Sequence, residues 1–109
     1  MDIKVVPHTE QDADIIMAGP LDAAATRDAR STFSSLLDEG KRNFIIDLGA
    51  VDFIDSSGLG ALVGFLKKVR IGEGSVRLRN GRRPIQKIFE LTHLDRVFDY
   101  ADGEERLAS

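Results

Sequence analysis

The segment from Phe44 to Arg70 constrains the fold most, because it places a helix downstream of a buried strand. Residues 44–48 are apolar at four of five positions, as expected for a strand that is covered on both faces. Apolar residues then recur at positions 59, 62, 63, 66 and 69, which is the spacing of one helix face. The sequence therefore predicts a strand, a nine-residue connection from that strand to the glycine-rich run at Gly58, and a helix over residues 55–70.

Two strands are predicted upstream of this unit. Ile3 and Val5 alternate with polar neighbours, and residues 13–18 form a second apolar run after a polar turn. These two runs are expected to form a hairpin. Gly19-Pro20 is expected to end the second strand, because proline cannot donate a hydrogen bond to a sheet.

Two residues mark the ends of the first helix. Asp22 is a good N-cap, because its side chain can accept a hydrogen bond from the free N–H groups of a first turn. Gly40 predicts the end, since glycine adopts the left-handed conformation common after a helix at little cost. The apolar face between them consists of Ala25, Ala29, Phe33, Leu36 and Leu37.

The C-terminal third predicts shorter elements. A strand alternates apolar residues with Arg77 and Arg79, so the arginine side of that strand is expected to contact water. Pro84 suits the first turn of a short third helix. Residues 96–100 are expected to form a last strand, and residues 102–107 a weak final helix.

The elements follow the order β-β-α-β-α-β-α-β, which predicts an α/β fold with a mixed sheet of four to five strands. The 109 residues suit one domain, and 42% hydrophobic and 30% charged residues are ordinary for a globular protein. No apolar stretch approaches the roughly 18 residues that cross a membrane, and the N-terminus lacks a signal-peptide pattern. We therefore expect one domain over residues 1–109 in a cytoplasmic protein, with no membrane association.

Composition argues against several kinds of site. The chain has no cysteine, which excludes disulfides and thiolate chemistry. His8 and His93 are isolated, which argues against a zinc site, and no metal or cofactor is expected. The net charge of −3 gives no general attraction to nucleic acid, and no aromatic residues interleave with the basic cluster between residues 67 and 87. That cluster predicts solvated faces, with a docking patch for an acidic partner as the alternative.

The start of the central helix is the candidate for function. Ser56 and Ser57 lie where free backbone N–H groups and the positive end of the helix dipole meet, which favours a phosphate. Aspartate and serine are also ordinary N-cap residues, so they do not require a function by themselves. Gly58, Gly60 and Gly64 add to the signal, because each costs up to about 1 kcal/mol in a helix relative to alanine. Either the helix packs close to the sheet there, or the backbone of a partner approaches the serines.

Enzymatic interpretations are not supported. The glycine-rich run follows its strand by nine residues, unlike a dinucleotide-binding loop, and Leu78 stands where that motif has an acid. The sequence contains neither a Gly-Lys-Ser/Thr phosphate loop nor the flanking glycines of a nucleophile elbow. A serine nucleophile would need a base, and neither His8 nor His93 has an evident route to it. We predict a protein that is not an enzyme.

The chain resembles the STAS domain family over nearly its whole length, specifically the stand-alone anti-sigma factor antagonists. The segments that carry the resemblance are residues 19–22 (Gly-Pro-Leu-Asp), 44–48 (Phe-Ile-Ile-Asp-Leu), 51–60 (Val-Asp-Phe-Ile-Asp-Ser-Ser-Gly-Leu-Gly) and 85–94 (Ile-Gln-Lys-Ile-Phe-Glu-Leu-Thr-His-Leu), followed by Val97-Phe98. The resemblance implies an STAS-like fold, with helices packed mainly on one side of the sheet.

In antagonists of this family the serine directly after the aspartate is phosphorylated, which corresponds to Ser56. The resemblance implies that the unphosphorylated form binds a serine kinase of the histidine-kinase-like ATPase fold. This kinase also acts as an anti-sigma factor, and phosphorylation releases it. A PP2C-type phosphatase and a monomeric or weakly dimeric state are implied as well. The implied partner-binding residues are Asp22, Asp55, Ser56, Ser57, Gly58, Leu59 and Gly60.

Two other functions stay open at this point. STAS-like domains also serve as accessory subunits of transporters or sensory assemblies without a phosphate cycle, and the glycine-rich helix start could bind a phosphate ligand or nucleotide. The chain departs from the family pattern at Arg77 and Arg79, where an apolar strand is common, and at His93, where glycine is common. Histidine can adopt the left-handed conformation there, at a greater steric cost than glycine, so a tolerated replacement at the helix end is expected.

Overall fold

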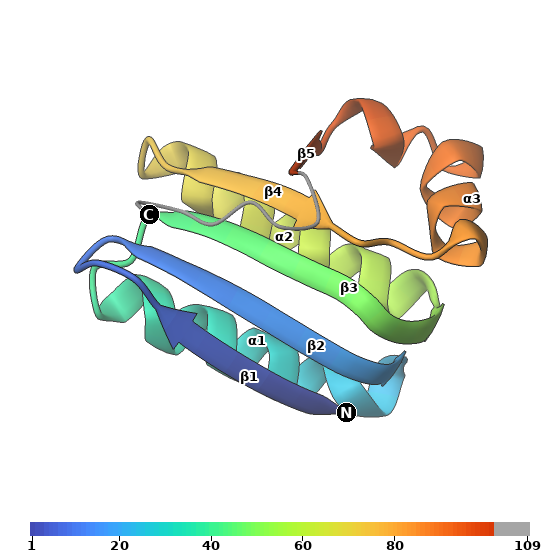
Figure 1. The fold of residues 1–109 in the computed structure, drawn as a ribbon, viewed down its shortest axis with the longest axis horizontal. Coiled ribbons are helices and arrows are strands. Elements are labelled where there is room, and N and C mark those ends of the chain that lie inside the picture. The colour runs from blue at the N-terminus through green and yellow to red at the C-terminus, as the bar shows by residue number, and fades with distance from the viewer. Residues whose placement is uncertain (102–109) are drawn as a thin grey trace.

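The computed structural model describes residues 1–101, which form a sheet of five strands together with three α-helices (Figure 1). In chain order the elements are β1 (Asp2–Pro7), β2 (Asp12–Leu21), α1 (Ala23–Asp38), β3 (Asn43–Ile54), α2 (Ser56–Ile71), β4 (Ser75–Arg79), α3 (Arg83–Leu91), the 3₁₀ helix η1 (Leu94–Arg96) and β5 (Asp99–Tyr100). The strands lie in the order β1-β2-β3-β4-β5; β1 is antiparallel to β2, and all other neighbours are parallel. The predicted α/β fold with a mixed sheet is confirmed, and the helix predicted over residues 102–107 lies outside the described residues.

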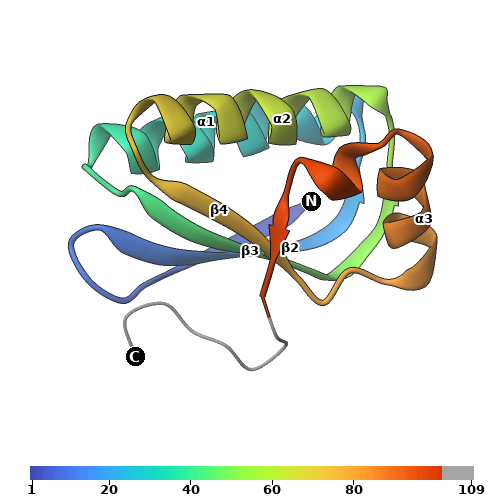
Figure 2. The same ribbon diagram turned by 90° about the horizontal axis from the view of Figure 1, so that it is seen from above.

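Helices α1 and α2 lie side by side and cover one face of the sheet, while α3 lies at one end of it (Figure 2). Phe65 of α2 stacks on Phe33 of α1, with the ring centroids 4.1 Å apart. Phe44 of β3 meets the Phe65 ring edge-on at 4.8 Å. Aromatic rings from three elements therefore hold the two helices against the central strand.

The second strand is longer than predicted. β2 continues through Gly19 and Pro20 to Leu21, so the prediction that these two residues end the strand is wrong. Its pairing with β3 shifts register between Ile16 and Ala18, and again between Ala18 and Pro20. Irregular pairing of this kind tolerates a proline, which has no N–H to donate. Gly19 has a φ of +99°, which glycine adopts without a steric cost.

The central strand is also longer than predicted. β3 extends to Ile54, and Asp55 alone separates it from α2, so the predicted nine-residue connection is wrong. The added length of β3 has a partner, because Ile54 pairs with Leu21 at the end of β2. The length of the connection therefore does not distinguish this turn from a dinucleotide-binding loop, whereas Leu78 in place of an acid still does.

The sheet face opposite α1 and α2 carries a buried cluster of charges. Arg79 of β4 is 6% exposed, so the prediction that its side of the strand contacts water is wrong for this residue. Its Nε lies 3.0 Å from Asp47 Oδ2, and its Nη2 lies 3.2 Å from Asp14 Oδ2. Asp14 is 2% exposed, and His8 Nε2 lies 3.3 Å from its other carboxylate oxygen. Asp14 belongs to β2 and Asp47 to β3. Both carboxylates therefore form ion pairs with the arginine from strands that precede β4 in the sheet.

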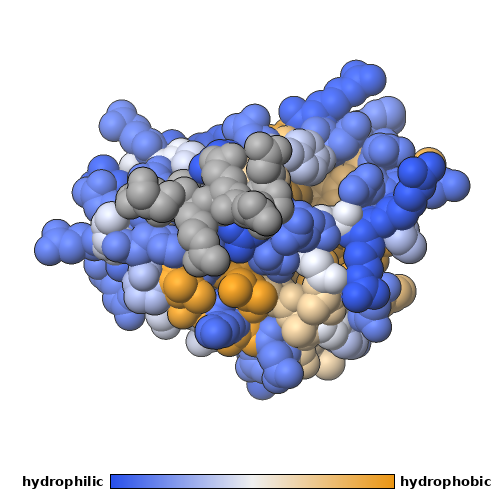
Figure 3. Space-filling view, in the orientation of Figure 1, coloured by the Kyte–Doolittle hydropathy of each residue, from blue (hydrophilic) through white to orange (hydrophobic). Residues whose placement is uncertain are grey.

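The face of the molecule that Figure 3 shows, in the orientation of Figure 1, is mainly hydrophilic. Polar residues surround a small apolar area there. Arg77 is half-buried, so it is neither fully solvated as predicted nor buried like Arg79.

Within residues 1–101, no helix has both the length and the apolar character that crossing a membrane requires.

The last described elements agree with the predictions in part. His93 has φ 62° and ψ 14°, the left-handed conformation expected of a residue that replaces glycine there. The strand predicted over residues 96–100 is shorter, because residues 94–96 form the turn η1 and β5 consists of Asp99 and Tyr100 only. β5 pairs with β4, with Tyr100 opposite Leu78.

Candidate functional site

Helices α1 and α2 begin side by side, because the strands that precede them are parallel neighbours. Leu21 ends β2, Ile54 ends β3, and these two residues are register partners. One aspartate follows each strand and caps the next helix, so Asp22 and Asp55 occupy equivalent positions. Two helix N-termini, with their free N–H groups and dipoles, therefore meet at one edge of the sheet.

Asp55 links the two helix starts through both oxygens of its carboxylate. Oδ1 accepts a hydrogen bond from the backbone N–H of Gly58 at 2.9 Å, and Oδ2 accepts one from the backbone N–H of Ala23 at 3.2 Å. Asp22 caps only its own helix, with Oδ1 3.0 Å from the backbone nitrogen of Ala25. The predicted N-cap role of Asp22 is confirmed, and Asp55 ties the first turn of α1 to that of α2.

We expect Asp55→Ala to lower stability more than Asp22→Ala, although each removes one N-cap. An N-cap side chain contributes about 1 kcal/mol to the free energy of unfolding. Because the Asp55 carboxylate also satisfies the Ala23 N–H, its loss is expected to cost about 2 kcal/mol. Urea unfolding followed by circular dichroism compares the two variants, and equal losses would show that the Ala23 contact contributes nothing.

Ser56 is the first residue of α2, and the turn does not depend on its side chain. Ser56 is exposed, whereas Ser57 is half-buried. The hydrogen bonds that hold the turn are made by Asp55, whose side chain binds the Gly58 N–H and whose carbonyl binds the Leu59 N–H at 2.9 Å. A charge added to the Ser56 hydroxyl would therefore leave these bonds in place and would lie at the positive end of the helix dipole.

The glycines of α2 have two different structural roles. Gly58 is buried against β2, and a Cβ there would lie 2.3 Å from the carbonyl oxygen of Leu21. A Cβ on Gly60 would lie 3.9 Å from the guanidinium of Arg30, and one on Gly64 would lie 4.0 Å from it. Close packing on the sheet thus explains Gly58, whereas Gly60 and Gly64 leave bare backbone beside a positive charge.

Two side chains near the turn were not predicted as site residues. Phe53 is 49% exposed, which is unusual for a large aromatic residue at the end of a strand. Phe53 and the exposed Asp52 both face solvent, and Ile54 is buried. Because Phe53 and Ile54 are both apolar, the sequence alone does not indicate which of the two is exposed. The position of Arg30 beside Gly60 depends on how α1 packs on α2, and no local motif reports that packing.

The sequence that forms these two capped helix starts matches a known family. A family model described as the STAS domain matches residues 4–107. The chain belongs to the STAS domain family. Its curated relatives include the anti-sigma-B factor antagonist of Bacillus subtilis strain 168, which is 31% identical to this STAS domain over 106 residues, 96% of each chain.

Solved structures of similar proteins have the same fold. The anti-sigma factor antagonist SpoIIAA in its unphosphorylated form matches this STAS domain with a TM-score of 0.83 at 23% identity, over 95% of this chain and 90% of that one. The Bacillus cell fate determinant SpoIIAA in its phosphorylated form matches with a TM-score of 0.77 at 23% identity, over 95% of this chain and 93% of that one. The STAS domain thus resembles SpoIIAA in both of that protein's phosphorylation states.

Proposed function

We propose that this STAS domain is an anti-sigma factor antagonist whose binding to its partner is controlled by phosphorylation of Ser56. The exposed Ser56 hydroxyl at the start of α2, beside the capping residue Asp55 and the first turn of α1, is the observation that carries this proposal. The similarity to a named anti-sigma-B factor antagonist over 96% of the chain supports it. The role is regulatory and needs no catalytic group in this chain.

The proposed partner is an anti-sigma factor that is also a serine kinase, with the histidine-kinase-like ATPase fold. It binds the surface formed by the first turns of α1 and α2, which includes Asp22, Asp55 and residues 56–60. Phosphorylation of Ser56 by this kinase releases the antagonist, and a PP2C-type phosphatase restores it. We expect the antagonist to act as a monomer or a weak dimer.

A phosphate on Ser56 is expected to change binding more than folding. Phosphoserine adds about −1.5 to −2 charge, and the helix N-terminus favours it by about 0.3–1 kcal/mol. A partner that covers the site must instead desolvate the phosphate or bring its own carboxylates close to it. Two unit charges 4 Å apart cost about 4 kcal/mol at an effective dielectric constant of about 20. Even half of that cost lowers the affinity more than about tenfold.

Affinity capture from native lysate tests the switch with wild-type, Ser56→Ala and Ser56→Asp baits, followed by mass spectrometry. Wild-type and Ser56→Ala are expected to retain a kinase of the anti-sigma type, and Ser56→Asp is expected to lose it. Ser35→Asp, an exposed serine near the end of α1, is the matched control for an added charge. If all four baits retain the same proteins, Ser56 is not the switch, and a constitutive role as an accessory subunit becomes the better interpretation.

Ser56 rather than Ser57 is expected to carry the phosphate, because Ser56 is exposed and Ser57 is half-buried. Incubation of the protein with the captured kinase and ATP, followed by fragmentation of the phosphopeptide, locates the modification. Ser56→Ala should abolish it, whereas Ser57→Ala should leave it in place. A phosphate found on Ser57 alone would contradict the assignment.

A further inference from the structure

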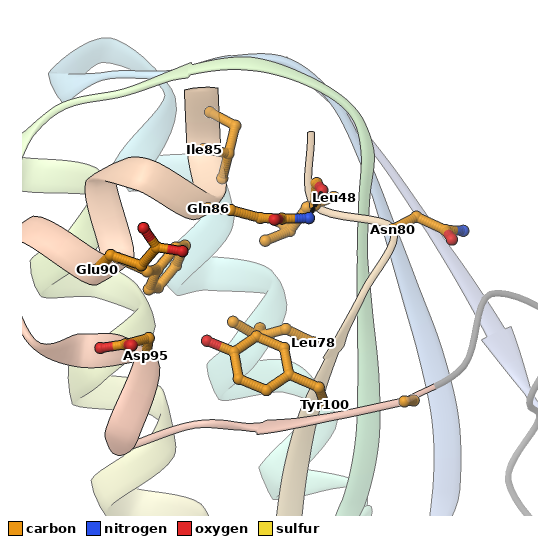
Figure 4. A pocket seen from close by; sticks show the side chains of 11 residues that line it. Leu48, Leu78, Asn80, Ile85, Gln86, Glu90, Asp95 and Tyr100 are labelled. Atoms are coloured by element: carbon orange, nitrogen blue, oxygen red, sulfur yellow. Dashed lines mark hydrogen bonds between the residues drawn. The ribbon is translucent and has the colours of Figure 1, made fainter. Parts of the chain in front are cut away.

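A cavity of about 450 Å³ opens between α3, β4 and β5 (Figure 4). Its volume lies within the range of about 300–1,000 Å³ that is typical of small-molecule sites. Four apolar side chains that line it, Leu48, Leu78, Ile85 and Phe89, are each 1–2% exposed. The lining residues differ from those proposed to bind the anti-sigma factor, so the cavity needs an explanation of its own.

Two carboxylates and a phenol, contributed by three elements, line this cavity beside the amide side chains of Asn80 and Gln86. Glu90 comes from α3, Asp95 from η1 and Tyr100 from β5, and Figure 4 shows the Tyr100 hydroxyl directed toward α3 and η1, with the Asp95 carboxylate turned away from it. Burial raises the pKa of Tyr100 above its ordinary value of 10.0, and the charges of Asp95 and Glu90 add to this effect. Tyr100 is 54% exposed and Asp95 is half-buried, so the polar side of the cavity is open to solvent.

The cavity is lined by negatively charged side chains, and the described residues of its lining provide no positive charge to balance them. Glu90 and Asp95 are acidic, and none of the described residues that line the cavity is a lysine or an arginine. An ammonium group has three N–H donors and no acceptor, which suits a lining that has carboxylate and phenol oxygens and no basic side chain among its described residues. A hard metal cation is a poorer match, because it requires about six or more oxygen ligands, and within residues 1–101 no group of three or more histidine, aspartate or glutamate side chains is placed to hold one.

We propose that this cavity binds a small organic ammonium ion. The ammonium group lies beside the Glu90 carboxylate and the Tyr100 hydroxyl, with the negative charge of Asp95 nearby, and the apolar body of the ligand packs on Leu78 and Phe89. The site is independent of Ser56, so its occupancy does not depend on phosphorylation. It gives the domain a second input beside the one proposed for the start of α2.

Tyr100 provides a direct signal for the test, because the chain has one tyrosine and no tryptophan. Cyclohexylmethylammonium, which has no aromatic ring, is titrated into the full chain while tyrosine fluorescence and ¹H–¹⁵N chemical shifts are recorded. Cyclohexylacetate and cyclohexylmethanol have similar apolar bodies with a negative and a neutral group. Saturable binding with shifts at residues of α3 and β5 is expected for the ammonium ion alone. The Ser56→Asp variant is expected to bind it as the wild type does, which separates this inference from the proposed switch.

Charge-neutral variants identify the groups that bind. Glu90→Gln and Asp95→Asn are each expected to weaken the affinity about fivefold, because each removes one negative charge from the lining of a partly exposed site. Glu10→Gln, in the exposed β1–β2 turn, is the matched control and should have no effect. Thermal unfolding checks that each variant is folded.

Several results would overturn the proposal. No saturable shift at millimolar ammonium ion, equal binding of cyclohexylacetate or cyclohexylmethanol, or an affinity that Glu90→Gln and Asp95→Asn leave unchanged would each do so. Tighter binding of Nα-acetyl-lysine methylamide than of cyclohexylmethylammonium would assign the cavity to a lysine side chain of a protein partner, and so contradict the small-molecule assignment.

Discussion

Arg79→Met is expected to lower the free energy of unfolding by about 3–5 kcal/mol, the effect typical of removing one partner from a buried ion pair. Asp14 is 2% exposed and Arg79 is 6% exposed, so neither group can be solvated by a small rearrangement. Methionine fills much of the arginine volume, which limits the effect of a cavity. The Asp14 carboxylate would then stay buried without the Arg79 guanidinium, with the His8 imidazole 3.3 Å from its other oxygen.

Guanidinium unfolding measures this loss, and three further variants establish its cause: Arg27→Met, Asp14→Asn, and Arg79→Met combined with Asp14→Asn. Arg27→Met changes an exposed arginine on α1 in the same way and should alter stability by no more than about 0.5 kcal/mol. Arg79→Met combined with Asp14→Asn removes the unpaired charge, and should recover part of the loss. If the double variant is as unstable as the sum of the two single variants, the two residues act independently and the ion pair is not the cause.

The sequence predicted the parts of the fold that depend on residues close together in the chain. Asp22 and the segment from Asp55 onward identified both helix starts, because capping is a contact between residues three apart. The strand ends were predicted wrongly, because β2 and β3 extend each other by pairing Leu21 with Ile54. The rule that proline ends a strand considers Pro20 and its neighbours in sequence. It could not account for the pairing of Pro20 with Phe53, which lies 33 residues further along the chain.

The burial of Arg79 was missed for the same reason. Alternation along β4 correctly placed Arg77 and Arg79 opposite the core, but the aspartates that pair with Arg79 are contributed by β2 and β3. At the candidate site, Ser56 and its capping residue could be identified locally, whereas the bond from Ala23 to Asp55 joins two helices. The cavity beside Tyr100 has lining residues from β3, β4, α3, η1 and β5, so no single motif could indicate it.

Gly58→Ala is expected to lower the free energy of unfolding by about 3 kcal/mol, at the upper end of the usual cost of overpacking. The added Cβ would lie 2.3 Å from the carbonyl oxygen of Leu21 and 2.8 Å from its Cγ, and a backbone atom cannot move aside as a flexible side chain can. The same carbonyl accepts a hydrogen bond from the Asp55 N–H at 3.3 Å, so displacement of Leu21 also disturbs the cap of α2.

Gly60→Ala is the matched control, because it adds the same methyl group one half-turn further along the same helix. Its Cβ would be in ordinary contact with Arg30 at 3.9 Å, so alanine should be neutral or stabilise the helix by up to about 1 kcal/mol. The pair of variants separates the two explanations for the glycines of α2. Gly58→Ala should lose stability, whereas Gly60→Ala should keep its stability and lose affinity for the captured kinase if the partner's backbone approaches there. If Gly60→Ala binds that kinase as tightly as the wild type, the backbone of the partner does not approach Gly60. Close packing of Gly58 on Leu21 would then be the remaining explanation for a glycine near Ser56.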